Sequence, residues 1–151
     1  MNVSNLPMVI NAAKQAGFTG ASLITAVAIA AAESGFDPDA MGDVNLQNQT
    51  WGPSVGLFQI RSLHNPLAYS YPDTLRVADA LRDPVYNAQA AYAISKKGTD
   101  FAPWSTFTNG AFQQFVSLVT GAEDIYTEVK KNPLALLLLL VIFGAIVLTI
   151  I

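Results

Sequence analysis

The chain has 151 residues, a net charge of −3, a single histidine and no cysteine. This length allows one domain and a smaller additional element. The composition excludes a disulfide framework, and His64 has no cysteine to join it in a metal site. Without a basic cluster, nucleic-acid binding has no support either. We therefore expect no metal, cofactor or nucleic-acid partner, and a fold stabilised by its hydrophobic core.

The first segment of the chain predicts a short amphipathic helix. Residues 1–6 lack a basic region and Lys14 interrupts the apolar residues that follow, so we expect no signal peptide. Val9, Ile10 and Ala13 recur on one side of a helix over 6–15, and Gly17 ends it.

Residues 21–34 predict a buried helix that carries one charge, Glu33, in its last turn. The segment has no Gly or Pro, is rich in alanine, and is apolar on all sides, which is typical of a central helix. Gly35 fits the left-handed position after its end. Burial and the negative end of the helix dipole would both raise the pKa of Glu33, as a general acid requires. The alternative is a helix that ends at the surface, with Glu33 solvated.

The middle of the chain predicts further short elements. The sequence Asp37-Pro38-Asp39 is typical of a turn, and the polar residues 45–54 favour a small β-hairpin or a long loop. Residues 75–81 form a short helix candidate. Asp83 and Pro84 are a cap and a first position for a helix that runs to about Lys97. Another helix begins at Asn109 or Gly110.

Five segments follow one another in a specific order between residues 5 and 118. They are Glu33–Gly35, Asp43–Ser54, Gly56–Ile60, Asn87–Ala91 and Trp104–Gly110. In this order they resemble the lysozyme-like superfamily, and within it the lytic transglycosylase and phage-tail lysozyme domains. The resemblance implies a mainly α, lysozyme-like fold with a small β-hairpin. It also implies cleavage of the β-1,4 bond between N-acetylmuramic acid and N-acetylglucosamine in peptidoglycan.

The resemblance implies a role for individual residues in that reaction. Glu33 would be the catalytic acid, Ser34 would help to hold the site, and Gln59 would line the groove and bind substrate. Asn87 and Asn109 are further substrate-binding candidates that the resemblance implies.

Three other side chains are candidates from their chemistry. Trp51 and Trp104 would stack on sugar rings, although core packing is the more common use of tryptophan in a small domain. Arg61 follows the Gly56–Ile60 segment directly, and we expect it to reach the substrate.

A second carboxylate is needed by hydrolases but not by many transglycosylases of this superfamily. Asp43 is the best candidate, because Asp37 and Asp39 have a simpler use in the turn. The sequence leaves hydrolysis and transglycosylation open. It also leaves open a non-catalytic glycan-binding or structural protein, and a membrane-permeabilising conduit component.

Residues 134–151 contain no charge and, as a helix, span ~27 Å against a bilayer core of ~30 Å. We predict a lysozyme-like domain over 1–120, a juxtamembrane segment over 121–132 and a transmembrane helix over 133–151, with lipid contact through Leu134–Ile151. Lys130 and Lys131 would keep the domain in the cytoplasm by the positive-inside rule, whereas peptidoglycan lies outside. A phage virion protein, delivered from outside and in contact with other virion proteins, would resolve this conflict.

Overall fold

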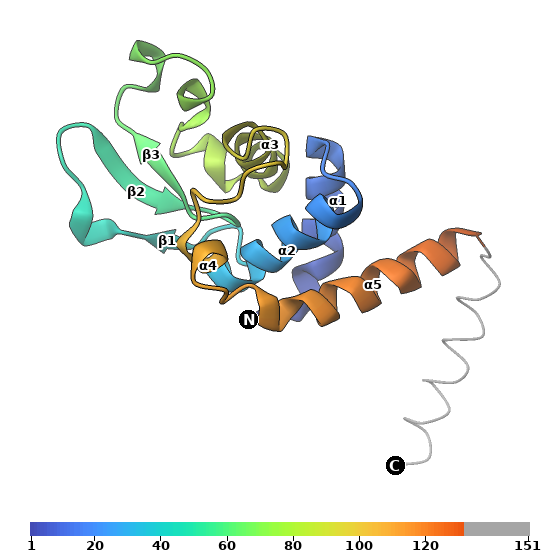
Figure 1. The fold of residues 1–151 in the computed structure, drawn as a ribbon. Coiled ribbons are helices and arrows are strands. Elements are labelled where there is room, and N and C mark those ends of the chain that lie inside the picture. Colours follow the sequence, from blue (N-terminus) through green and yellow to red (C-terminus); the bar gives the residue numbers. More distant parts are fainter. Residues whose placement is uncertain (132–151) are drawn as a thin grey trace. The chain divides into compact units, whose positions relative to one another are not determined.

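The computed structural model describes residues 1–131, in a fold that is mainly helical with one small antiparallel sheet. The chain divides into a compact unit Met1–Val119 and a second unit Thr120–Ile151. The first unit has helices α1 (Leu6–Ala16), α2 (Gly20–Ser34), α3 (Pro84–Ile94) and α4 (Ser105–Thr108), and strands β1 (Met41–Gly42), β2 (Trp51–Val55) and β3 (Ile60–Leu63) (Figure 1). Helix α5 (Gln113–Lys131) begins in this unit and continues into the second. The predicted fold class is confirmed for these residues.

Helix α2 is the centre of the first unit, as its apolar sequence predicts. Every residue from Ala26 to Ala31 is buried. Thr19 and Ser22 form a capping box at its start, and Gly35, with a φ of 61°, ends it in the left-handed conformation. Helix α1 packs against α2 and α3, while α4 contacts α2 (Figure 1). The carboxyl end of α2, with Glu33, is therefore held inside the domain.

Residues 45–54, for which the sequence predicts a small β-hairpin or a long loop, form part of the loop between the paired strands β1 and β2 and most of strand β2. Strands β2 and β3 form a second hairpin, with Val55 opposite Ile60, so β2 is the central strand of the sheet. Gly56 and Gln59, with φ values of 77° and 46°, reverse the chain between the two strands. A Cβ atom at Gly56 would clash with the Asn87 side chain and the Leu81 carbonyl, so the turn requires glycine here.

The later helical predictions need correction at their ends. The helix predicted over 75–81 is replaced by two 3₁₀ turns, Asp73–Leu75 and Ala80–Arg82. Helix α3 starts as predicted, with the Asp83 carboxylate accepting from the Tyr86 amide, but it stops at Ile94. Lys96, Lys97 and Gly98 follow with positive φ values, a backbone conformation that no α-helix contains.

The predicted transmembrane helix over 133–151 lies outside the described residues. Among residues 1–131, no helix has both the length and the apolar character that crossing a bilayer requires. The division into a domain, a juxtamembrane segment and a membrane helix stays a prediction.

Candidate active site

A cleft of about 770 Å³ in the first unit brings together much of the predicted site. Helix α2, the sheet with its loops, and the segment before α4 contribute its walls. Of the predicted residues, the cleft is lined by Glu33, Asp43, Trp51, Gln59, Arg61 and Trp104. Within residues 1–131, no group of three or more histidine or acidic side chains is placed to hold a metal ion.

Glu33 is half-buried at the end of α2 and lines the cleft. Its Oε1 atom accepts a hydrogen bond of 2.6 Å from the Oγ1 hydroxyl of Thr106 in α4. Burial raises the pKa of Glu33 above its ordinary value, hydrogen bonds from Thr106 oppose this, and the negative charge of Asp43 raises the pKa further. The raised pKa predicted from the sequence is confirmed, and burial is its main cause.

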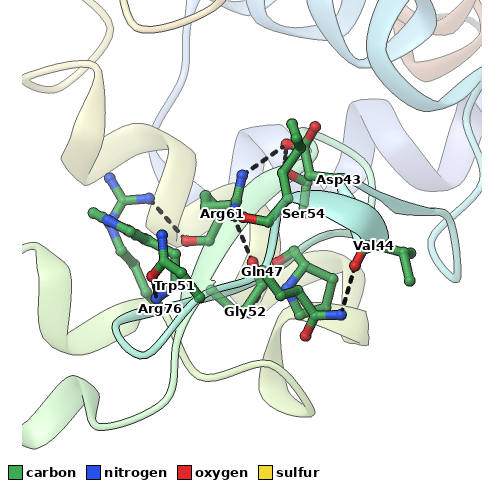
Figure 2. A network of polar contacts seen from close by, with 12 residues as sticks. Asp43, Val44, Gln47, Trp51, Gly52, Ser54, Arg61 and Arg76 are labelled. Carbon is green, nitrogen blue, oxygen red and sulfur yellow. Dashed lines mark hydrogen bonds and ion pairs between the residues drawn. The ribbon is translucent and has the colours of Figure 1, made fainter.

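Asp43 shares the cleft with Glu33 and is held by two neighbours. Its Oδ2 atom accepts a hydrogen bond of 2.6 Å from the Ser54 hydroxyl and lies 3.5 Å from the Arg61 guanidinium (Figure 2). Asp43 lies near enough to Glu33 for its negative charge to raise the pKa of Glu33.

Arg61 links strand β2 to the loop between β1 and β2 in the cleft wall. Its guanidinium pairs with Asp43 and also donates to the carbonyl oxygens of Gly52 in β2 and Leu46 in the loop between β1 and β2. These contacts use all three nitrogen atoms of the guanidinium within the protein. Arg61 lines the cleft, and each nitrogen of its guanidinium contacts the strand or loop over 43–52. Its expected contact with the substrate stays a prediction.

Replacing Arg61 with Gln should release this loop and weaken substrate binding. With soluble glycan fragments, the substrate that the resemblance implies, we expect the KM to rise roughly tenfold, equal to ~1.4 kcal/mol of binding energy, with a smaller change in kcat. Steady-state kinetics on the full-length protein would measure both. Arg82→Gln is the matched control, because Arg82 pairs with Asp39 at the surface and does not line the cleft. Equal effects of the two substitutions would contradict a role for Arg61 in the wall.

The Gly56–Ile60 turn is held from three directions by residues that the sequence placed in the site. The Gln59 amide donates to the carbonyl oxygens of Ala40 and Gly56. The Trp104 indole donates a bond of 2.8 Å to the carbonyl of Phe58. The side-chain oxygen of Asn87 accepts from the Phe58 amide at 2.9 Å. The turn is thereby fixed to the residue before β1, to α3 and to the segment before α4.

Asn87 therefore differs from its predicted role. It is fully buried, its amide also donates to the carbonyl oxygens of Val55 and Leu81, and it does not line the cleft. Trp104 is 6% exposed and packs against Phe58 and Phe101, so core packing explains most of its surface even though it reaches the cleft.

Trp51 and Arg76 form the other end of the same polar network. Figure 2 shows Arg61 between Asp43 and Ser54 on one side and Trp51 and Arg76 on the other. The Arg76 guanidinium lies 5.4 Å from the centre of the Trp51 ring and donates to the carbonyl of Arg61. Trp51 is half-buried and lines the cleft, so its predicted stacking on a sugar ring stays a prediction.

Two predicted residues lie away from the cleft. Ser34 donates back to the Ala30 carbonyl and borders a separate hollow near Met1 and Asp37. Asn109 is exposed, and its side chain accepts from the Ala111 amide just after α4. Neither residue is placed to contact a substrate bound beside Glu33.

Sequence reasoning missed Thr106, Ser54 and Arg76. Thr106 lies inside the segment Trp104–Gly110, and Ser54 is the last residue of the segment Asp43–Ser54, so both segments were recognised without these roles. A sequence signal for Thr106 is its position two residues after Trp104. The Trp104 indole is bonded to the turn, which places the residues after it near the cleft. Arg76 lies outside all five recognised segments and had no such signal.

The family model described as "Lysozyme like domain" matches residues 10–106 of this chain. The matched range is more than half of the chain and contains Glu33, the sheet and the anchored turn. Comparisons with curated proteins and with solved structures gave no match. A lysozyme-like domain indicates lysozyme or lytic transglycosylase activity on peptidoglycan. The chain therefore belongs to the lysozyme-like domain family.

Proposed function

We propose that this protein cleaves the β-1,4 bond between N-acetylmuramic acid and N-acetylglucosamine in peptidoglycan, with Glu33 as the general acid. The observation that carries this proposal is a half-buried carboxyl group with a raised pKa in the wall of a polar cleft. Perturbed carboxyl groups in clefts are typical of acid catalysts. Membership of the lysozyme-like domain family supports the same substrate class.

In the proposed reaction, protonated Glu33 donates its proton to the oxygen of the glycosidic bond. The bond between this oxygen and the anomeric carbon breaks, and the leaving sugar keeps the proton as a hydroxyl group. Either water or a hydroxyl group of the same sugar then attacks the anomeric carbon. Glu33, now ionised, accepts the proton of the attacking group and is ready for another cycle.

In this proposal, the carboxylate of Asp43 stabilises the positive charge that develops at the anomeric carbon as the bond breaks. Its hydrogen bond with Ser54 and its ion pair with Arg61 hold its carboxylate in the cleft wall, while Glu33 donates the proton. Glycosidases commonly use two carboxyl groups in different roles.

A plot of kcat/KM against pH should fall on its basic side, and the pKa of Glu33 should set the pH of this basic limb. The acid must be protonated to react, so activity is present below its pKa and is lost as the pH rises through it. Because burial and the Asp43 charge raise this pKa, the limb should lie above 4.5, the ordinary value for glutamate. Measuring kcat/KM against pH with a soluble glycan would test this. A limb at or below the ordinary value would contradict a buried acid.

Product analysis tests the proposed reaction itself. The full-length protein, in a mild non-ionic detergent, would be incubated with purified peptidoglycan and the products read by mass spectrometry. Muropeptides with reducing ends would identify a hydrolase, and anhydro-muropeptides would identify a lytic transglycosylase. Both should be absent with Glu33→Gln. No product from a folded protein would contradict the enzymatic proposal and favour a glycan-binding module.

The sequence also supports a proposal for where the protein acts, namely at the envelope of a bacterial host. In this proposal residues 133–151 cross the membrane as a helix, and the protein is a phage virion component that reaches the host envelope from outside. The uncharged run supports the helix, and Lys130 and Lys131 before it raise the conflict with an external substrate that virion delivery resolves. Detection of the protein in purified virions would support this location. Its presence only in membranes of uninfected bacteria would contradict it.

A further inference from the structure

Helix α4 brings one hydroxyl group to the carboxyl group of Glu33. Thr106 Oγ1 donates to Glu33 Oε1 at 2.6 Å, although the two residues are 73 positions apart in the chain. Ser105 and Trp104, directly before Thr106, line the cleft. The hydroxyl group therefore comes from the residue that follows this part of the cleft lining, in the first turn of α4.

The backbone around Thr106 is fixed on both sides. Trp104 is buried and its indole is bonded to the Phe58 carbonyl at 2.8 Å. After the short helix, the Phe112 amide donates to the Thr106 carbonyl at 3.1 Å. Thr106 is a β-branched residue with few rotamers, so a fixed backbone limits the directions that its hydroxyl group can take.

We propose that Thr106 is a positioning residue. Its hydroxyl group donates a hydrogen bond to Oε1 of Glu33, so that the catalytic proton is carried by the other oxygen, Oε2. A carboxyl group has two oxygens, and a proton on the wrong one cannot reach the glycosidic oxygen. A proton on Oε1 would weaken that oxygen as a hydrogen-bond acceptor and so weaken the bond from Thr106. The hydrogen bond therefore disfavours protonation of Oε1 relative to Oε2. This inference rests on the proposed function of Glu33.

The hydrogen bond has a second effect that can be measured. Burial raises the pKa of Glu33, whereas the bonds from Thr106 lower it. Removing the hydroxyl group therefore raises the pKa further. A variant without it should show a lower rate from the disordered carboxyl group, together with a basic limb that moves to higher pH. A change in packing alone would lower the rate and leave the limb in place.

Three variants of the full-length protein separate these outcomes. Thr106→Val keeps the shape and removes the hydroxyl group, while Thr106→Ser keeps the hydroxyl group. Thr108→Val is the matched control, because Thr108 lies in the same helix and is exposed, and its hydroxyl donates to the Ser105 carbonyl instead. We expect Thr106→Val to lower kcat roughly ten- to a hundredfold, with KM little changed and the basic limb at higher pH. Thr106→Ser should restore most of the rate, and Thr108→Val should resemble the wild type.

The pKa of Glu33, measured directly by NMR titration of the labelled side chain, gives a readout independent of activity. It should be higher in Thr106→Val than in the wild type and the Thr108→Val control. An active wild type with unchanged rate and pKa in Thr106→Val would overturn the role of Thr106 alone. An inactive wild type would overturn the proposed function, and with it any catalytic role of Thr106, even if the pKa of Glu33 moved as expected.

Discussion

Replacing Glu33 with Gln should lower the rate of peptidoglycan cleavage by about 10²–10⁴-fold or more, the range that acid–base catalysis alone contributes. Glutamine has the same shape and its side-chain oxygen can still accept the hydrogen bond from Thr106. It has no proton acidic enough to give to a leaving sugar. The rate of release of soluble muropeptides from purified peptidoglycan would measure the loss.

The same substitution should not weaken the fold. Because the pKa of Glu33 is raised in the folded protein, the folded state binds a proton more readily than the unfolded chain. Its contribution to stability therefore falls as the pH rises through the unfolded value and is lowest above the folded pKa. Glutamine removes this penalty, so the variant should unfold at neutral pH at the same temperature as the wild type, or higher.

A matched control for Glu33→Gln is Asp79→Asn. Asp79 is an exposed acid that does not line the cleft. The activity and the unfolding temperature of the Asp79→Asn variant should therefore match those of the wild type. Cleavage by Glu33→Gln at the wild-type rate would contradict the assignment of the acid. Loss of activity together with loss of folded structure would show a structural role for Glu33 instead.

Helix α2 and the position of its acid could be predicted because their causes are local. A run of small apolar residues favours a helix, its lack of a polar face requires burial, and Gly35 ends it. Glu33 then lies in the last turn by counting. The raised pKa follows from the same local facts, since burial is its main cause.

The uses of Arg61 and Asn87 could not be predicted, because their causes are distant in sequence. Arg61 was expected to reach the substrate because it follows the Gly56–Ile60 segment, but its bonds reach back to Leu46 and Gly52. Asn87 bonds with Phe58, 29 positions earlier. The sequence shows which side chains can form hydrogen bonds, but only the folded chain shows which backbone groups they meet.

The turn between β2 and β3 was not predicted, for a related reason. Residues 45–54 are polar, which favoured a hairpin or a long loop there, whereas Gly56–Ile60 is largely apolar. The turn occurs at the apolar segment because Gly56 and Gln59 adopt positive φ values while Asn87 and Trp104 bond the backbone between them. Polar composition indicates a turn only where no distant side chain replaces water as the hydrogen-bond partner.

Replacing Asn87 with Ala should be the most destabilising of the substitutions at the predicted site residues. Its side chain accepts from the Phe58 amide and donates to the carbonyl oxygens of Val55 and Leu81, at 2.8–2.9 Å, with no exposed surface. Alanine would leave all three backbone groups without their partner. Each buried group without a partner costs ~1–3 kcal/mol, so the free energy of unfolding should fall by about 3 kcal/mol or more.

Urea unfolding of the full-length protein, followed by circular dichroism in a mild non-ionic detergent, would measure this loss. Asn109→Ala is the matched control, since Asn109 is exposed and its side chain caps a single amide, that of Ala111. It should cost ~1 kcal/mol or less. The resemblance gave these two asparagines the same role, so a large difference in stability between the variants would separate them. If Asn87→Ala instead kept its stability and lost only substrate binding, Asn87 would be a binding residue and the anchor of the Gly56–Ile60 turn would have to lie elsewhere.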